Sequence, residues 1–252
     1  MSGRSAVVVA HPDDEILWLS SAMASAAHIV LCYGAPFGKP AKAAARRRAV
    51  ANLRLATLVD LAIPESGTRL LVDWRHPLMT PTGIGIADPD AQLRYDDNFN
   101  TLLAQLRPVL AGCADVYTHN PWGEYGHPEH VQVHRAVTAL QAELGYTVWF
   151  SNYAGPLTLT LARQLGAGAC WAEKRVVRPN KAIARRLQWV YLCHRAWTWA
   201  LLHRWPAEET MYAQPPGPDR AGWCSLAGET LLDVAGLRWW PPGRDPMRRP
   251  AF

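Results

Sequence analysis

Short apolar runs rich in β-branched residues recur along the first 152 residues and predict buried β-strands. The runs are 5–10, 28–33, 60–64, 114–119 and 146–152. Segments with apolar residues at helical spacing lie between or after them, at 15–27, 39–59, 90–108 and 127–144. This alternation of strand and helix predicts an α/β fold with a mostly parallel sheet covered by helices.

Two regions interrupt the alternation. Residues 65–92 are rich in Gly, Pro, Thr and Asp and predict a long irregular excursion, which in a compact domain is often functional. After residue 155 Trp and Arg become frequent, and 181–205 has the pattern of one long helix. We therefore expect a core at 1–155 and a Trp/Arg-rich helical extension at 156–252. The extension should pack on the core through its aromatic side chains, and a lid or substrate wall is the alternative role.

Composition narrows the class of protein. The chain has 252 residues, of which 49% are hydrophobic, so it can bury a large core. Its net charge of +5 comes from scattered basic residues, which favours a solvated surface over a nucleic-acid interface.

Five cysteines without a CxxC pair argue against a disulfide framework or a thiolate metal site. The apolar run at the N-terminus is too short for a signal peptide, and no segment is long enough to span a membrane, so a cytoplasmic protein is expected. Oligomeric state leaves no signal in the sequence.

Two polar segments each follow a predicted strand. The first is AHPDDE, residues 10–15, and the second is EYGHPEHVQVH, residues 124–134. In open α/β sheets, ligands bind outside the carboxyl ends of the strands where the strand order reverses. The two segments can therefore meet in one crevice.

The residue types in these segments suit a catalytic metal. Imidazole and carboxylate bind zinc and similar ions, and a catalytic zinc keeps three protein ligands and one open position. His11 and Asp14 lie on one turn, and His130 would complete a His-Asp-His set. Asp13 could hold a water beside the ion, and His127 would lie on a neighbouring flank. An ordinary hydrogen-bonding histidine or a helix-capping aspartate would explain any one of these residues, but capping does not need three consecutive acids.

The order and spacing of AHPDDE and YGHPEHVQVHRAV resemble the PIG-L/LmbE-like family of zinc-dependent N-deacetylases. The resemblance covers roughly residues 5–150. It implies a Rossmann-like fold with helices on both faces of the sheet, in agreement with the alternation above. The family acts on N-acetylglucosamine conjugates of glycosylphosphatidylinositol, mycothiol, bacillithiol and glycopeptide-antibiotic pathways.

The resemblance also implies roles for individual residues. The implied metal ligands are His11, Asp14 and His130, and the implied catalytic residues are Asp13, His127 and Tyr125. Asp13 matches the general base, His127 the histidine that stabilises the oxyanion or protonates the departing amine, and Tyr125 a tyrosine that polarises the carbonyl. The chain departs from the family in two places. Glu129 stands where Asp is common, and ARRRAVANLRLA lacks the glutamate of the family's Arg-x-x-Glu pattern, which puts the sugar contacts of that region in doubt.

These observations favour a metal-dependent hydrolase that removes an N-acyl group, foremost N-acetyl, from an amino-sugar conjugate. The bond cleaved would be a linear amide and not a peptide bond. The expected cofactor is Zn²⁺, with Fe²⁺ as the alternative, and the expected partner is a small glycoconjugate. A 2-His-1-carboxylate iron oxygenase and a non-catalytic carbohydrate-binding protein are the competing functions.

Substrate identity has few signals in the sequence. Trp122 lies in the loop before Tyr125 and is the aromatic residue expected to contact substrate. Residues 65–92 and the C-terminal third are expected to select the conjugate. Thiol-glycosides, antibiotic intermediates, nucleotide sugars and acyl chains longer than acetyl all remain open.

Overall fold

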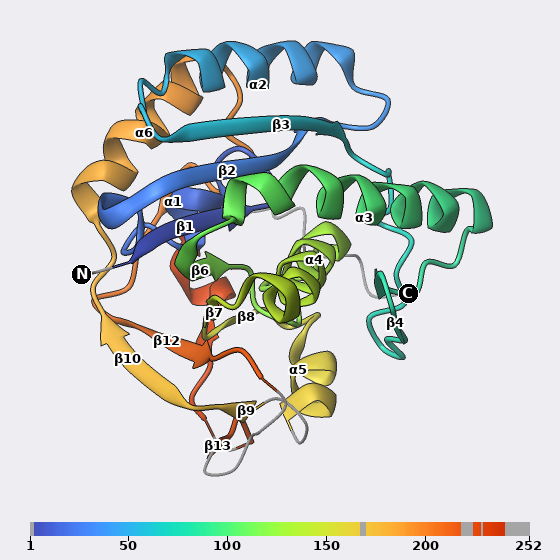
Figure 1. Cartoon of the computed structure of the whole chain (residues 1–252). Helices are drawn as coiled ribbons and strands as arrows, with labels where there is room; N and C mark the ends of the chain where they lie inside the picture. The colour runs from blue at the N-terminus through green and yellow to red at the C-terminus, as the bar shows by residue number, and fades with distance from the viewer. Residues whose placement is uncertain (1–2, 167–169, 218–223, 228, 240–252) are drawn as a thin grey trace.

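A seven-stranded sheet forms the centre of the molecule in the computed structural model, which describes residues 3–166, 170–217, 224–227 and 229–239 (Figure 1). Its strand order is β10-β12-β7-β6-β1-β2-β3. The strands are β1 (Arg4–Val9), β2 (Ala26–Ala35), β3 (Leu58–Pro64), β6 (Cys113–Thr118), β7 (Thr147–Ser151), β10 (Glu173–Val177) and β12 (Glu209–Gln214). The strands from β3 to β7 are parallel, and β12 is antiparallel to both of its neighbours, β7 and β10. The predicted mostly parallel α/β sheet is confirmed.

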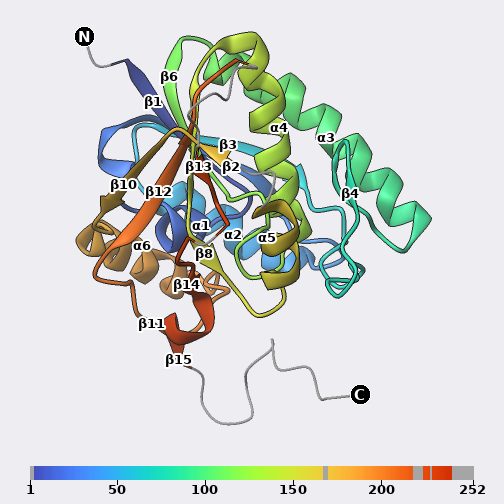
Figure 2. The same cartoon turned by 90° about the horizontal axis from the view of Figure 1, so that it is seen from below.

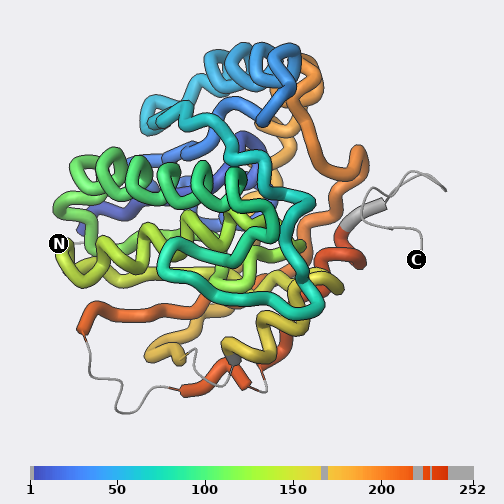
Figure 3. The backbone as a smooth tube through the Cα atoms, turned by 90° about the vertical axis from the view of Figure 1, so that its right-hand side faces the viewer, coloured from blue at the N-terminus to red at the C-terminus, as the bar shows by residue number. Residues whose placement is uncertain are grey.

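Helices cover both faces of this sheet. They are α1 (Asp14–Trp18), α2 (Pro40–Asn52), α3 (Pro89–Leu110), α4 (Pro128–Leu144), α5 (Leu159–Gly166) and α6 (Lys181–Cys193). Strand β1 sends Val7 and Val9 into a core shared with α1, α2 and α6, and Ala6 and Val8 into a core shared with α3 and α4. This division follows from the two-residue period of a strand. Figure 3 shows α3 and α4 (green) side by side on their face of the sheet.

The strand order reverses between β1 and β6. From β1 the chain continues to β2 and β3 on one side, and after α3 it returns to β6 and β7 on the other side. The two polar segments follow the carboxyl ends of β1 and β6, which are hydrogen-bonded neighbours. The sheet topology therefore brings these segments to one crevice, as open α/β sheets do at this point.

Three predicted helices are shorter than expected. The segment 15–27 forms only α1 and the 3₁₀ turn η1 (Met23–Ser25), and α2 ends at Asn52 instead of residue 59. The predicted helix 181–205 ends at Cys193, because Arg195 adopts a left-handed conformation (φ 56°). The backbone N–H groups of Ala196 and Arg195 then donate to the carbonyls of Tyr191 and Leu192, a Schellman motif. Glycine usually occupies the left-handed position of this motif, so an arginine there did not indicate the end of the helix in the sequence.

The C-terminal extension contains strands as well as helices. β10 and β12 join the central sheet next to β7, and Figure 2 shows these two strands side by side from below. Strands of two residues also pair outside the central sheet, near the extension and in the loop at 65–92. The pairs are β4 (Met79–Thr80) with β5 (Gly83–Ile84), β8 (Tyr153–Ala154) with β14 (Leu232–Asp233), β9 (Cys170–Trp171) with β13 (Cys224–Ser225), and β11 (Leu202–His203) with β15 (Arg238–Trp239). A second 3₁₀ turn, η2, spans Val234–Leu237. The expected helical extension contains the helices α5 and α6 but also strands that the sequence analysis did not predict, and the division at residue 155 stays a prediction.

The aromatic side chains of the extension differ in exposure. Trp199 and Trp205 are buried in the core that also contains Trp18, whereas Trp189 on α6 is 67% exposed. The Trp205 indole N–H donates to the carbonyl of Ile16, directly after the first polar segment. These contacts support the packing role expected for most of these aromatic residues. No helix in the described part of the chain is long and apolar enough to cross a membrane.

The buried carboxyl of Glu209 on β12 is expected to make the stability of the folded chain depend on pH. Burial raises the pKa of Glu209 to about 7, although Ser21 and Tyr153 donate hydrogen bonds to its oxygens. The folded chain therefore holds a proton that the unfolded chain loses near pH 4.5. Stability contributed by this proton falls as pH rises from about 4.5 to 7, by roughly 3 kcal/mol in total.

Glu209→Gln is accordingly expected to be more stable than the native chain at pH 8, with a smaller difference at pH 5. Urea denaturation at both pH values measures the free energy of unfolding. Glu208→Gln, at an exposed neighbour that pairs with Arg178, is the matched control and should change little. Identical pH dependence of the native chain and Glu209→Gln would contradict the assignment.

Candidate active site

The two polar segments meet in the structure although more than a hundred residues separate them. The ring centroids of His11 and His127 lie 4.4 Å apart, and those of His11 and His130 lie 5.4 Å apart. All three rings are buried. Asp13 and Asp14 follow His11 on the turn into α1, and His127 caps the N-terminus of α4. The crevice anticipated from the sequence is therefore present.

Asp14 lies at the centre of the cluster. Its Oδ2 is 3.1 Å from Nδ1 of His11 and 3.1 Å from Nε2 of His130. The Trp18 indole donates to the other carboxylate oxygen at 3.0 Å and the backbone N–H of His11 donates to Oδ2 at 2.8 Å, so the carboxylate is fixed in orientation. The three side chains predicted as metal ligands thus turn one nitrogen, one oxygen and one nitrogen toward one another.

Carboxylates also fix the far side of each imidazole. Nε2 of His11 lies 2.8 Å from Glu129, and Nδ1 of His130 lies 2.6 Å from Glu124. A histidine whose outer nitrogen donates to a carboxylate presents the lone pair of its inner nitrogen, the arrangement usual around bound metals. Glu129, at the position where the resembled family commonly has aspartate, therefore places a carboxylate within reach of His11.

The electrostatics of the cluster follow from burial and charge. Burial alone would raise the pKa of the Asp14 carboxyl, but His130 and His11 more than offset this and hold its pKa well below its usual value. Burial would lower the pKa of His11, whereas hydrogen bonds with Asp14 and Glu129 raise it to about 10. The cluster thus attracts positive charge, and a cation that binds here would displace protons from the imidazoles.

A divalent metal fits this donor set. In the described residues, Nε2 of His130 is a buried polar atom without a hydrogen-bond partner, and it faces Asp14. Groups whose donor atoms lie within 4.8 Å of one another are His11/His127/His130, Asp14/His119/His130 and His11/Glu65/Glu129. His119 is an unsuitable ligand, because its Nε2 accepts from the backbone of Ala10 and its Nδ1 faces Glu124. Imidazole with carboxylate suits zinc or ferrous iron.

Asp13 is held beside the cluster and not inside it. The backbone N–H and the hydroxyl of Thr198 both donate to its Oδ2, at 3.0 and 2.7 Å. Its backbone has φ 99°, a left-handed conformation that is costly for a residue other than glycine and that recurs at functional sites. Burial and the neighbouring charge of Asp14 raise the pKa of Asp13 to about 6, which suits a proton acceptor near neutral pH.

His127 and Tyr125 form the opposite side of the site. Burial and the charges of His11 and His130 hold the pKa of His127 well below its usual value, so its imidazole is neutral. Nδ1 of His127 accepts from the backbone N–H of Glu129, which places the proton on Nε2. The Tyr125 ring lies 5.2 Å from that of His130, and burial raises the pKa of its phenol well above 10, so the hydroxyl is a proton donor.

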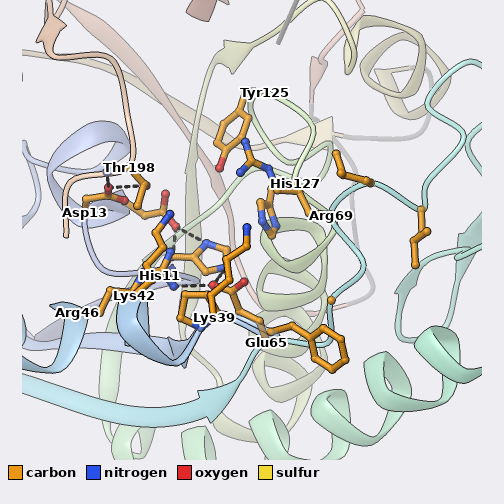
Figure 4. A pocket seen from close by; sticks show the side chains of 16 residues that line it. His11, Asp13, Lys39, Lys42, Arg46, Glu65, Arg69, Tyr125, His127 and Thr198 are labelled. Atoms are coloured by element: carbon orange, nitrogen blue, oxygen red, sulfur yellow. Dashed lines mark hydrogen bonds and ion pairs between the residues drawn. The ribbon is translucent and has the colours of Figure 1, made fainter. Parts of the chain in front are cut away.

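A cavity of about 520 Å³ opens onto this cluster (Figure 4). Its wall contains five of the predicted residues, His11, Asp13, Asp14, Tyr125 and His127. His130 lies behind them and is fully buried. The remaining lining comes from the loop between β2 and α2, from α2, from the loop after β3 and from Thr198: Pro36, Phe37, Lys39, Lys42, Arg46, Glu65, Gly67, Arg69, Leu70, Leu71 and Thr198. The volume accommodates a sugar with a substituent.

Comparison with known proteins identifies the fold. No family model and no curated protein matches the sequence. The structure is similar to that of teicoplanin deacetylase in a zinc-inhibited form, with a TM-score of 0.54 and 16% identity over 86% of this chain and 99% of that one. It is also similar to a deacetylase–teicoplanin complex, with a TM-score of 0.55 and 16% identity over 86% of this chain and 100% of that one. The chain has the fold of these deacetylases.

Within this deacetylase fold, several residues of the site were not predicted. Glu65 pairs with Arg46 at 2.5 Å and lies 3.7 Å from His11. It supplies a carboxylate near the arginine-rich helix, where the sequence lacks the glutamate of the family pattern. Glu65 directly follows β3, so its position at the carboxyl edge of a strand was a usable signal. Glu124 opens the second polar segment, which was a signal, but its contacts with His119 and His130 depend on the loop conformation; Thr198 had no signal, because its contact with Asp13 depends on long-range packing.

Trp122 lies away from the cavity of this fold. Its side chain is 1% exposed, donates to the carbonyl of Tyr153 and packs against Phe150 in the hydrophobic core. The loop that contains it turns the indole inward. The structure gives Trp122 a packing role and does not support the substrate contact expected of it.

Proposed function

We propose that this protein is a metal-dependent deacetylase that removes an N-acyl group, foremost N-acetyl, from an amino-sugar conjugate. The proposal rests on one observation above all. His11, Asp14 and His130 turn their donor atoms toward one another at the wall of a cavity, with Asp13 beside them. The teicoplanin deacetylases that share the fold support this choice of reaction and suggest a glycopeptide-type conjugate.

His11, Asp14 and His130 would hold the metal, with zinc proposed and ferrous iron as the alternative. When bound, such a cation lowers the pKa of a water ligand and polarises a carbonyl oxygen. The charged side chains around the site favour a bound cation. Asp14 supplies a carboxylate ligand, and the outer nitrogens of His11 and His130 each face a further carboxylate. The proposed ligands His11 and Asp14 lie in the wall of the cavity, so a substrate amide in the cavity can reach the metal site.

Asp13 is the proposed general base. Thr198 fixes one of its oxygens, which leaves the other free to accept a proton from the attacking water. A positioned base of this kind contributes about 10²–10⁴-fold to the rate. After the amide carbon becomes tetrahedral, Asp13 can return the proton to the nitrogen, so that the amine leaves as a neutral group.

His127 and Tyr125 are the proposed donors to the developing oxyanion. The neutral His127 ring carries its proton on Nε2, and Tyr125 keeps its phenolic proton. Both side chains line the cavity and can donate hydrogen bonds to an oxygen on the substrate carbonyl. Removal of one such donor typically costs about 10²–10³-fold in rate.

The test is release of amine and acetate from N-acetylglucosamine conjugates, including a glycopeptide pseudoaglycone that bears this sugar. The protein is assayed after loading with Zn²⁺ or Fe²⁺, after chelation, and with oxygen excluded. Metal-dependent release that persists without oxygen is expected. Oxygen-dependent turnover would favour the oxygenase, and saturable sugar binding without release in any metal form would favour the non-catalytic protein.

A further inference from the structure

Three cationic side chains in the cavity wall have no ion-pair partner in the part of the chain that the structure describes. Lys39, Lys42 and Arg69 all line the cavity, and in residues 3–166, 170–217, 224–227 and 229–239 no carboxylate lies within ion-pair distance of them. Arg46, in the same wall, differs because it pairs with Glu65 at 2.5 Å. The carboxylates of Asp13, Asp14 and Glu65 share this wall, but the described residues hold none of these three cations in an ion pair.

The position of the lysines on α2 is unfavourable for the helix. Lys39 is the N-cap and Lys42 lies in the first turn, and this turn contains no acidic residue. The N-terminus of a helix carries partial positive charge, so acidic side chains are favoured there and lysines are not. Lys39, Lys42 and Arg46 recur at helical spacing and therefore share the face of α2 that borders the cavity. Helix stability does not account for this arrangement.

Lys42 is also partly withdrawn from water. Its side chain is half-buried, and burial together with the nearby Arg46 guanidinium lowers its pKa. A half-buried ammonium group next to another cation is stabilised when an anion reaches it. Figure 4 shows Lys42 and Lys39 on one side of the cavity, with Arg69 beside His127 on the other. An anion between them would lie next to the reacting amide.

We propose that the conjugate attached to the amino sugar carries an anionic oxygen group, a carboxylate or a phosphate, and that Lys42 and Lys39 bind it. Arg69 lies across the cavity, where it can contact the same group or the sugar. The inference rests on the proposed deacetylase function and specifies its substrate class. Exposed Phe37 and Leu70, in the same wall, would contact an apolar part of the conjugate.

Three synthetic substrates test this proposal: the methyl, 2-carboxyethyl and 2-phosphoethyl glycosides of N-acetylglucosamine. We expect the metal-loaded protein to have a kcat/KM about tenfold or more higher for an anionic glycoside than for the neutral one. The preference should weaken as salt is added. The carboxyethyl and phosphoethyl arms show which anion is preferred.

Variants of Lys42 and Arg48 distinguish a role in anion binding from a role in the structure of α2. Lys42→Met should reduce the ratio of anionic to neutral kcat/KM to near one, and Lys42→Arg should restore most of it. Arg48→Met removes an exposed cation from the same helix away from the cavity and should leave the ratio unchanged. Equal rates on all three glycosides, or a Lys42→Met variant that retains the preference, would overturn the proposal.

A binding measurement keeps this test distinct from that of the proposed function. The free-amine forms of the same three glycosides are titrated into the metal-loaded protein by calorimetry. Tighter binding of an anionic form, lost in Lys42→Met, would support the anion site even if no substrate were turned over. Equal binding of charged and neutral forms together with rapid, unselective deacetylation would refute the anion site and leave the deacetylase assignment intact.

Discussion

Asp13→Asn is expected to lower kcat by about 10²–10⁴-fold while the protein keeps its metal. Asparagine has nearly the same shape as aspartate but cannot accept the proton of the attacking water. It also tolerates the left-handed backbone at this position, where φ is 99°, so the turn into α1 should persist. Steady-state kinetics on an N-acetylglucosamine conjugate, together with metal analysis of the same sample, measure both properties.

Thr198 provides a graded comparison with this variant. Its backbone N–H would still donate to Asp13 in Thr198→Val, but the hydroxyl at 2.7 Å would be lost. A smaller loss of kcat, roughly tenfold, is expected from the missing hydrogen bond to a charged group. Thr198→Ser retains a hydroxyl and should recover most of the rate. Near-native kcat in Asp13→Asn would show that another group acts as the base.

The parts of the fold that could be predicted from the sequence depend on local patterns. Valine-rich runs mark β1 and its neighbours because a strand buried on both faces must be apolar throughout. Because parallel strands end at one edge of the sheet, this pattern also predicted the meeting of His11 with His127 and His130. The meeting required only that β1 and β6 be adjacent, as they are in the central sheet.

The remaining features depend on contacts that have no local signal. The end of α6 depends on one arginine in a conformation that glycine usually adopts. The inward orientation of Trp122 depends on a loop in which the next two residues, Gly123 and Glu124, adopt positive φ angles, and the loop position alone suggested exposure. Thr198 reaches Asp13 across 185 residues of chain, and no spacing rule connects them. Sequence patterns thus located the chemistry but not the residues that position it.

Loss of the bound metal is the other large effect that we expect. His130→Ala and Asp14→Ala should each abolish stoichiometric metal binding and activity, because only three protein ligands are proposed. Glu124→Ala leaves these ligands in place but removes the carboxylate that faces Nδ1 of His130 at 2.6 Å. A weaker effect is expected there, about 10–100-fold in metal affinity. Competition with a chromophoric chelator measures all three affinities.

His127→Ala decides between the proposed ligand set, which joins Asp14 to His11 and His130, and the group His11/His127/His130. If His11, Asp14 and His130 hold the ion, His127→Ala keeps the metal and loses rate, whereas Asp14→Ala loses both. If His11, His127 and His130 hold it, the metal contents of these two variants are reversed. His76→Ala, at an exposed histidine paired with Asp73, controls for general loss of metal-binding imidazole. The first outcome is expected, because Asp14 is the carboxylate that both His11 and His130 face at 3.1 Å, and a dication bound among buried side chains is stabilised by such a charge.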